Sequence, residues 1–520
     1  MSRPPSRPRG GLVRGRDHPR DPARSGPLKS PDRGSDLDFF EWEVGWGAFI
    51  LGVERRPDPT SAMKRTLSRR QLLKLLGAAG FGAPIATRAI ADETSFGSVG
   101  AKVPENIVVP GRARDRYPAQ WVDGKVVQPA RPLAVLHETD VLVVGGGPAG
   151  FAAAVAAARA GAATTLVERY GYLGGLWTGG LVLLVYPTHA TEDGRLTKVV
   201  RGVGDELLER IARHPEGATR YADGKPDPTT DPEITKLVMD EMTVAAGVKL
   251  FFHCWVADVV LAEGAVRGVV IESKAGRQSI LAKVVVDASG DGDVFAAAGA
   301  AHEQRLHAVG LVHRLGNVDR ADLSGLREAG FRNLGSVEPL ASVQWVNLRG
   351  PSTDGLDIEE LSRLEVEHRR SIWQRVDKIR RTAGGENVFL LQTAPQIGVR
   401  ITRLLAGVRK MTDQDARSST RYPDTIAIGG TYGAGAQNPG FAIPYGAMVP
   451  RKLDNLIAAG RCLDVDSPMV EDMRLIATCL LTGHAAGVAA ALAVRDRRRP
   501  RDVEIRELQG LLREQGAYLG

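Results

Sequence analysis

The sequence predicts an α/β fold built on a parallel sheet, and three observations predict it. The chain has 520 residues, enough for two domains with a substantial buried core. It contains 60 glycines and only 5% aromatic residues, which favours α/β layers with tight strand-to-helix turns over an aromatic-rich sandwich. The stretch DVLVVGGGPAG, residues 140–150, reads as an apolar strand that runs into a glycine-rich turn and an alanine-rich helix.

Charge and cysteine content narrow the possible functions. The net charge is +7, but residues 1–91 account for this excess, with 17 basic and 9 acidic residues. The body of the chain, residues 92–520, has 51 basic and 52 acidic residues and is therefore nearly neutral. A neutral body gives no reason to expect a nucleic-acid partner. The cysteines Cys254, Cys462 and Cys479 have neither the number nor the spacing of a disulfide framework or a zinc site. We therefore expect buried thiols and no bound metal.

An export signal is expected well inside the chain. Residues 68–74, SRRQLLK, resemble the twin-arginine export motif, and residues 75–86 form an apolar run that is too short for the ~20 residues of a membrane span. Ala89-Ile90-Ala91 supplies a small-residue cleavage site, and cleavage there would leave Asp92 first. The resemblance implies the twin-arginine export machinery as a partner and a periplasmic or secreted location. Because that route carries folded proteins, it suits an enzyme that folds around its cofactor before export.

Residues 1–62 precede this signal and are rich in Pro, Arg, Gly and Asp, a composition that buries little apolar surface. We expect translation to begin at Met63, where a signal peptide would start. Residues 1–62 would then lie upstream of the true start and would not be part of the protein. The alternative is a genuine disordered extension.

The glycine turn has the full pattern of a dinucleotide fingerprint. Gly145 permits the tight turn, Gly147 lets the backbone approach a pyrophosphate, and Gly150 lets the helix pack closely on the strand. The pyrophosphate would lie over the N-terminus of the helix at residues 151–160. The second strand ends at Glu168, 18 residues after Gly150, where a carboxylate can accept hydrogen bonds from ribose hydroxyls.

Four further sequence blocks indicate whether the cofactor is FAD or NAD. They are ERYGYLGGLWTGGLV (168–182), AKVVVDASGDGDVFAAAGA (282–300), DNLIAAGRCLDVDSP (454–468) and RLIATCLLTGHAAGVAAALAV (474–494). Together with the fingerprint they resemble the FAD-dependent oxidoreductases of the glutathione-reductase-like superfold. They are most similar to a group whose members read GGGPAG…E…GG…DATGDGD…AGRC…TGQAAG. No second fingerprint for NAD(P)H follows in the sequence.

The resemblance implies FAD as the cofactor and implies its contacts. The N-terminus of the helix at 474–494 would face the pyrimidine ring of the flavin and stabilise negative charge there. The sequence departs from the pattern at two positions. Ser289 replaces Thr, which is a mild change, and His484 replaces Gln, a change that we expect to alter a contact near the flavin. The implied cofactor-binding residues are Gly145, Gly147, Pro148, Ala149, Gly150, Glu168 and Arg169 for the ADP half, Gly174 and Gly175 in the paired-glycine loop, Val256 for adenine, and Ser289, Gly290, Asp291, Gly460, Arg461 and Thr478 for the flavin side.

The order of the blocks predicts a Rossmann-like FAD-binding domain with a parallel sheet, interrupted by an α+β substrate domain. The FAD-binding domain is expected at 139–300 and again at 441–495, and the substrate or cap domain at 301–440. Residues 92–138 read as an extended arm, and residues 496–520 as a C-terminal helix.

Candidate catalytic residues lie in or next to the insert. His313 falls on an expected strand whose side chains could reach the flavin, where it could act as a base. Arg400 and Arg403, three apart, would share a helix face and hold an anionic substrate group. Tyr445 could line the site. For the arginines the alternative is a surface salt bridge, and for His313 and Tyr445 a satisfied polar group in the core.

The sequence therefore favours an exported FAD-dependent oxidoreductase that transfers a hydride between a small organic substrate and the flavin. Oxygen, a quinone or a redox protein would accept the electrons. One alternative is a reductase of a polar double bond with Arg403 as the acid, and another is a non-redox flavoprotein, either an isomerase or lyase or the binding subunit of a complex. The substrate itself is not encoded in any motif, because one fold supports many reactions.

Overall fold

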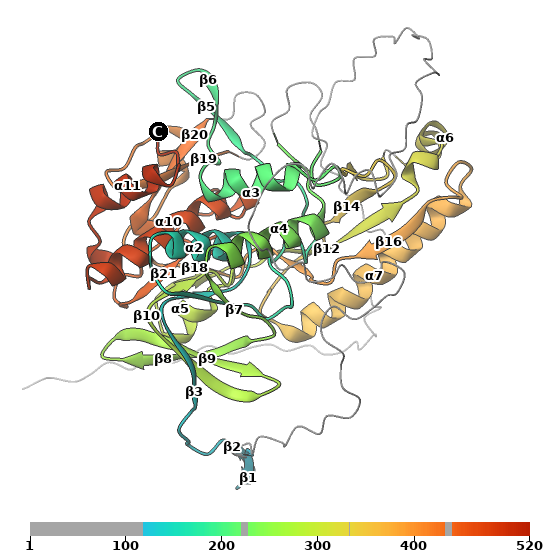
Figure 1. Ribbon diagram of the computed structural model, residues 1–520. Coiled ribbons are helices and arrows are strands. Elements are labelled where there is room, and N and C mark those ends of the chain that lie inside the picture. Colours follow the sequence, from blue (N-terminus) through green and yellow to red (C-terminus); the bar gives the residue numbers. More distant parts are fainter. Residues whose placement is uncertain (1–117, 220–226, 332, 432–438) are drawn as a thin grey trace, which may run out of the picture. The chain divides into compact units, whose positions relative to one another are not determined.

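The computed structural model describes residues 118–219, 227–331, 333–431 and 439–520 (Figure 1). The predicted N-terminal extension, the export signal and residues 92–117 of the predicted arm lie outside the described residues.

The main sheet has seven strands, six of them in the order β7-β4-β3-β10-β9-β8, with β21 paired to β10. The long strand β10 (Gly276–Asp287) pairs with β9 in antiparallel along its first half, and with β21 in parallel at its last three residues. A strand from the C-terminal block thus completes the sheet of the N-terminal block. This confirms the predicted α/β fold with a parallel-strand sheet. The other strands are β3 (Val135–Val144), β4 (Thr164–Val167), β7 (Lys249–Phe251), β8 (Trp255–Ala262), β9 (Ala265–Ser273) and β21 (Leu456–Ala458).

Two helices, α2 (Pro148–Arg159) and α10 (Ile476–Arg495), pack directly against each other beside this sheet (Figure 1). Small residues make the close approach possible. A Cβ added to Gly483 would lie 2.1 Å from the carbonyl oxygen of Ala149, and one added to Gly487 would lie 2.1 Å from that of Ala153. The two helix backbones are therefore in contact, which fixes the fingerprint turn against the C-terminal block.

In the described part of the chain, α10 is long and apolar enough to cross a membrane, with a mean hydropathy of 1.7 over 18 residues. That whole window is buried inside the protein, where α10 packs against α2 and β19 (Thr425–Gly430). Its apolar composition is accounted for by this position in the core.

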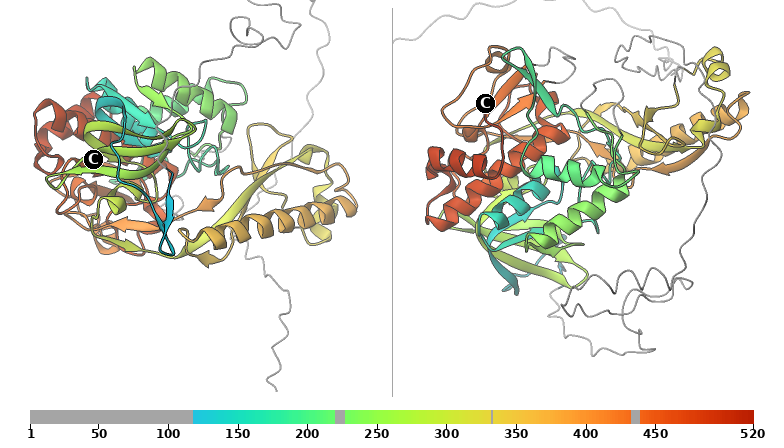
Figure 2. Two further views of the ribbon diagram at one scale, coloured as in Figure 1. Left: turned by 90° about the horizontal axis from the view of Figure 1, so that it is seen from below. Right: turned by 45° about the horizontal axis from the view of Figure 1, so that its top comes forward.

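A second sheet forms the cap. Its central strand β12 (His307–Gly316) pairs with β14 (Gln344–Leu348) and β16 (Phe389–Thr393), and α7 (Ile358–Arg381) lies along these strands (Figure 2). The cap has a core of its own, to which β12 contributes Leu311 and Leu315, and α7 contributes Ile372, Val376 and Ile379. The short strands of the cap are β13 (Ser336–Val337), β15 (Ser352–Thr353) and β17 (Gly398–Val399).

The segment after the cap returns to the main core, which includes Leu404, Ile426 and Phe441. Helix α4 begins at Pro232, because the side chain of Asp231 accepts hydrogen bonds from two backbone N–H groups of the first turn and proline is favoured at the first helical position. The remaining elements are β1 (Gln120–Val122), β2 (Lys125–Val127), β5 (His189–Glu192), β6 (Arg195–Lys198), α3 (Val203–Ala212), α4 (Pro232–Ala245), α5 (Asp293–Ala297), β11 (His302–Gln304), η1 (Val318–Arg320), α6 (Leu323–Glu328), β18 (Arg403–Leu405), α8 (Asp413–Arg417), β19 (Thr425–Gly430), β20 (Gly440–Pro444), η3 (Tyr445–Ala447), α9 (Val470–Met473), η4 (Pro500–Asp502) and α11 (Ile505–Glu514).

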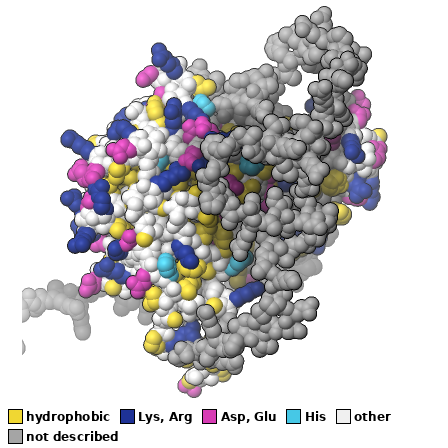
Figure 3. Space-filling model, in the orientation of Figure 1, with side chains coloured by type: hydrophobic (Ala, Val, Ile, Leu, Met, Phe, Trp, Pro, Cys, Tyr) yellow, Lys and Arg dark blue, Asp and Glu magenta, His cyan; other side chains and the backbone are white. Residues whose placement is uncertain are grey.

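On the face shown in Figure 3, Lys and Arg side chains of the described residues lie intermingled with Asp and Glu side chains. This mixture agrees with the nearly neutral charge of residues 92–520.

Candidate active site

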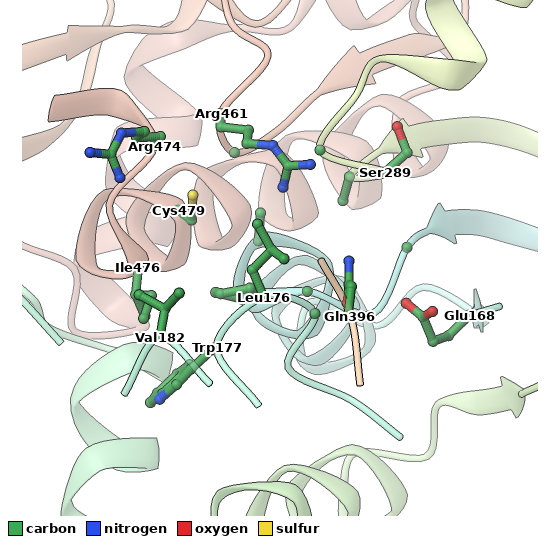
Figure 4. Close-up of a pocket in the computed structure, with 18 of the residues that line it drawn as sticks. Glu168, Leu176, Trp177, Val182, Ser289, Gln396, Arg461, Arg474, Ile476 and Cys479 are labelled. Carbon is green, nitrogen blue, oxygen red and sulfur yellow. The ribbon is translucent and has the colours of Figure 1, made fainter. Parts of the chain in front are cut away.

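A cavity lies at the carboxyl ends of the main strands, between the sheet, the start of α10 and the cap (Figure 4). It comprises about 1460 Å³ of space, part of it open to solvent. Val144 and Ala288 line it from the ends of β3 and β10, Ile476 from α10, and Val312 and Asn347 from the cap sheet. Ligands of open α/β sheets bind at this edge, so the cavity is where the fingerprint predicts the cofactor.

Thirteen of the predicted residues line the cavity, and seven do not. Those that line it are Gly145, Gly147, Pro148, Ala149, Glu168, Arg169, Gly175, Val256, Ser289, Gly290, Arg400, Gly460 and Arg461; those outside the lining are Gly150, Gly174, Asp291, His313, Arg403, Tyr445 and Thr478.

The three fingerprint glycines differ in their surroundings. A Cβ on Gly145, whose φ is +97°, would lie 2.5 Å from the carbonyl oxygen of Ala288, and one on Gly150 would lie 1.7 Å from that of Gly145. A Cβ on Gly147 would meet nothing nearer than the Cα of Gly175, 4.0 Å away. Gly145 and Gly150 are therefore required for packing, whereas Gly147 leaves an open cradle that fits a pyrophosphate.

Glu168 is held rigidly at the wall of the cavity. Its carboxylate accepts hydrogen bonds from the backbone N–H of Gly146 at 2.6 Å and of Tyr170 at 2.9 Å. Beside it, the Arg169 guanidinium lies 4.9 Å from the ring centre of Tyr170 and 5.0 Å from that of Trp255. Trp255 lines the cavity and is 55% exposed, so it offers a flat apolar surface next to Val256. The fingerprint did not point to Trp255 or Tyr170; an aromatic residue just before Val256 was the available signal.

The SGDGD turn is organised by a residue that precedes it. The buried Asp287 accepts hydrogen bonds from the Ser289 hydroxyl and N–H through one carboxylate oxygen, and from the N–H groups of Val294 and Phe295 through the other. Burial raises its pKa to about 6 despite these bonds. The carboxylate thereby fixes the turn to the first residues of α5.

Asp291 acts on the site through Arg461. Its carboxylate pairs with the Arg461 guanidinium at 3.0 Å and accepts a hydrogen bond from the Thr402 hydroxyl at 2.9 Å. Arg461 lines the cavity, and its buried Nε has no hydrogen-bond partner among the described residues. Such an orphaned donor at the wall fits a cofactor with acceptor oxygens.

The first turn of α10 forms the end of the cavity opposite Glu168. Burial raises the pKa of Cys479, which lines the cavity, to about 12, so the thiol is protonated at neutral pH. Thr478 is fully buried behind this wall, and the hydroxyl of Thr482 accepts a hydrogen bond from the Gly460 N–H. The expectation that His484 alters a contact near the flavin is wrong, because His484 bonds to Gln515 at 2.9 Å beyond α11.

The catalytic candidates are placed differently from the predictions. His313 does not reach the cavity, because strand alternation turns Gly310 and Val312 toward it instead. His313 is buried without a hydrogen-bond partner among the described residues, and burial lowers its pKa to about 4. Tyr445 does not line the site either; it is buried and donates to the carbonyl of Pro500 at 2.9 Å.

Arg400 and Arg403 do not share a helix. Arg403 begins strand β18 and does not line the cavity; it binds the carboxylate of Asp293, which does, at 3.0 Å and the carbonyl of Asp291 at 2.9 Å. Arg400 follows β17 and does line the cavity. Pairing of these segments with cap and core strands overrides the helical spacing.

The lining residues that were not predicted include Asn347, Gln396 and Arg474. Arg474 is paired with Glu471, whose carboxylate also lies 2.9 Å from Nε2 of His307. Asn347 and Gln396 come from segments without a motif, and only the tertiary structure brings them to the cavity, whereas Arg474 begins the block at 474–494 but was not predicted to bind the cofactor.

A comparison with protein families identifies the family of the chain and its cofactor. The family model described as FAD dependent oxidoreductase matches residues 140–310 and 317–512, more than half of the chain. The chain belongs to the FAD-dependent oxidoreductase family. FAD is therefore the cofactor of this oxidoreductase, and the open cradle at Gly147 and the orphaned Arg461 donor suit it.

Individual relatives of the oxidoreductase match shorter segments. Thiamine thiazole synthase of Methanococcus vannielii is 33% identical over 165 residues, which cover 30% of this chain and 57% of that protein. The synthase of Metallosphaera sedula is 32% identical over 170 residues, covering 31% and 57%. The chain thus spans just over half the length of these curated relatives.

Solved structures resemble the flavoenzyme at low identity. A geranylgeranyl bacteriochlorophyll reductase-like protein from Thermoplasma acidophilum is 15% identical, covers 73% of this chain and 84% of its own, and has a TM-score of 0.39. THI4 from Thermovibrio ammonificans is 27% identical, covers 31% and 61%, and has a TM-score of 0.24.

Proposed function

We propose that the protein is an exported FAD-dependent oxidoreductase that transfers a hydride between a small organic substrate and FAD. The observation that carries the proposal is the continuity of the cavity. The residues of the cofactor motifs and the cap residues Gly310, Val312 and Asn347 line the same space, so a molecule held by the cap would lie next to the cofactor.

In this proposal, residues of the chain bind the cofactor, orient the substrate and exclude water from the reacting carbon. When bound, FAD supplies the electron sink, and the electrons pass on to oxygen, a quinone or a redox protein. Val182, Leu176 and Trp177 contribute apolar lining that excludes water from the reacting carbon. Arg461 and the N-terminus of α10 place positive charge at the flavin end of the cavity.

The proton released by the substrate goes to water in this proposal, because His313 lies outside the cavity and no histidine is among its described lining residues. The alternative of a reductase with Arg403 as acid loses its basis, since Arg403 is bound to Asp293 and does not line the cavity. No observation in the described part favours a non-redox role.

The visible spectrum of the purified protein tests the cofactor and the reaction. We expect absorption peaks near ~375 and ~450 nm, and anaerobic bleaching of the second peak by an oxidisable substrate. After acid precipitation, a yellow supernatant indicates non-covalent FAD, and a yellow pellet a covalent link. A folded but colourless protein, which FAD does not turn yellow, contradicts the proposal.

The proposal that the protein is exported rests on the motif at residues 68–74. We expect the protein in the exported fraction with Asp92 as its first residue, and the double substitution Arg69→Lys, Arg70→Lys to retain it in the cytoplasm. Lys64→Arg with Arg65→Lys is the matched control, because these basic residues follow Met63 but lie outside the motif. Equal export of both double variants, or a mature chain that begins before Met63, would contradict the proposal.

A further inference from the structure

Gln396 of the cap brings an unsatisfied polar atom to the cavity. The residue lies in the segment between β16 and β17, and Figure 4 shows its side chain among the lining residues. Only 9% of the residue is exposed, and its buried Oε1 receives no hydrogen bond from any described residue. A buried acceptor without a donor is unfavourable, and an O–H or N–H group of a ligand would satisfy it.

Two backbone hydrogen bonds fix the segment that carries Gln396. The N–H of Ala394 donates to the carbonyl of Val312 on β12 at 2.8 Å, and the N–H of Gln396 donates to the carbonyl of Gly179 at 3.0 Å. Gly179 belongs to the block at residues 168–182, which carries the paired glycines of the cofactor motif. Gln396 is therefore anchored where the cap meets this loop, and the backbone holds it in place at the cavity.

The anchored segment lies between apolar parts of the lining. Val312, whose carbonyl holds the segment on the cap side, lines the cavity. Leu176 and Val182 flank Gly179 in the loop, are joined by a backbone hydrogen bond of 3.2 Å, and line the cavity as well. Gln396 thus places one unsatisfied acceptor among aliphatic side chains. A ligand with an apolar body and one donor group matches this combination.

A hydroxyl fits the acceptor of Gln396 better than an ammonium group does. The acidic residues of the described lining are Glu168 and Asp293. Glu168 accepts two backbone hydrogen bonds, and Asp293 pairs with Arg403. An ammonium ion at Gln396 would therefore be buried without a carboxylate of its own, which is unfavourable, whereas a hydroxyl carries no charge.

We propose that the substrate is an apolar alcohol whose hydroxyl donates a hydrogen bond to Oε1 of Gln396. The inference rests on the proposed function: the carbon that bears the hydroxyl loses a hydride to FAD, the O–H proton goes to water, and the C–O bond becomes the C=O bond of an aldehyde or ketone. The product has no O–H group, so Oε1 loses its donor when the reaction is complete. We therefore expect the product to bind more weakly than the alcohol, which favours its release.

Three probes of the same shape test this contact in the FAD-loaded protein. The first, 2-phenyl-2-propanol, has no hydrogen on its hydroxyl-bearing carbon and cannot be oxidised there; tert-butylbenzene has a methyl group in place of the hydroxyl, and 2-phenyl-2-propylamine has an ammonium group. Binding is read from the change in the flavin absorption spectrum. We expect the alcohol to bind at least about threefold tighter than the hydrocarbon and about tenfold tighter than the ammonium compound, because a site built around a hydroxyl rejects analogues that leave its buried acceptor unpaired or bury a charge.

Variants assign the preference to Gln396. Gln396→Leu removes the acceptor and keeps the backbone bond to Gly179, so the protein should fold and should now bind tert-butylbenzene tighter than the alcohol. Gln396→Met repeats the comparison with an unbranched side chain. Gln344→Leu is the matched control, because Gln344 on β14 of the cap also has a buried Oε1 without a partner among the described residues but lies outside the lining. It should keep the preference for the alcohol.

The outcomes are distinguishable from those of the proposed function. A yellow protein that binds none of the three probes, binds the alcohol no tighter than the other two, or keeps its preference in both Gln396 variants overturns the substrate class but not the flavoenzyme. Weaker binding of FAD in both Gln396 variants, with the preference unchanged, would assign the amide to the cofactor and would also overturn the substrate class. A protein without flavin overturns the proposed function itself.

Discussion

Gly483→Ala is expected to prevent stable folding and the retention of FAD. The added Cβ would lie 2.1 Å from the carbonyl oxygen and 2.7 Å from the Cα of Ala149, which are backbone atoms of α2 and cannot turn aside. The helices must separate, so we expect the free energy of unfolding to fall by more than about 3 kcal/mol, above the usual cost of overpacking. The neighbouring Thr482 holds the Gly460 N–H at the cavity, and FAD should therefore be lost with the packing.

Gly510→Ala is the matched control for this variant. Gly510 also lies in a helix, α11, but a Cβ there would meet nothing within 4 Å. Alanine is the better helix former, so this variant should gain about 0.5–1 kcal/mol. Urea unfolding followed by circular dichroism, together with the ratio of flavin to protein absorbance, measures both effects. Equal unfolding midpoints for Gly483→Ala and the unaltered protein would refute the contact between the two helix backbones.

Asp287→Asn is expected to produce the second large effect. Both oxygens of Asp287 accept hydrogen bonds, from Ser289 on one side and from the N–H groups of Val294 and Phe295 on the other. An asparagine keeps only one acceptor oxygen and turns an NH₂ group toward donors. Leaving two buried donors unsatisfied costs about 2–6 kcal/mol, and the SGDGD turn at the flavin should loosen.

The exposed Asp357 supplies the control, since it caps α7 through one oxygen, which accepts from the N–H groups of Glu359 and Glu360. Asparagine caps a helix as well as aspartate, so Asp357→Asn should change stability little. Urea unfolding and the dissociation constant of FAD provide the comparison. Similar stabilities for the two variants would contradict the role of Asp287.

The raised pKa of Asp287 predicts how the stability of the protein depends on pH. Burial raises its folded-state pKa from 3.8 to about 6, so the folded protein binds more protons than the unfolded chain between these values. The contribution of Asp287 to stability is therefore fully present below about pH 4 and is lost as the pH rises through 6. This part of the pH dependence should be missing from Asp287→Asn when its unfolding is compared with that of the unaltered protein.

The sequence was informative where neighbouring residues carry the chemistry. The fingerprint glycines and Glu168 are recognisable because strand, turn and helix follow one another within 30 residues. Backbone geometry alone then places Gly147 at the cavity and Glu168 at its wall. The α/β class follows from the same short-range pattern.

The cap side of the site depends on long-range pairing and was predicted less well. Which face of β12 meets the cavity depends on its pairing with β14 and β16, and strand alternation places His313 on the face opposite to Gly310 and Val312. Arg400 and Arg403 have helical spacing, but strand pairing on both sides extends the chain. Gln396 has no local pattern at all, and only its unsatisfied buried oxygen distinguishes it.

The contact between α2 and α10 also has a consequence for biosynthesis. Helix α2 ends at Arg159 and α10 begins at Ile476, so a ribosome working at 5–20 residues per second needs roughly 15–60 s to make the residues between them. During that interval the nascent fingerprint helix lacks its partner, and β10 lacks β21. A prematurely terminated chain that stops before α10 cannot build the end of the cavity. We expect such a fragment to bind FAD more weakly than the whole chain, so that a quality-control step that accepts only the loaded protein would reject it.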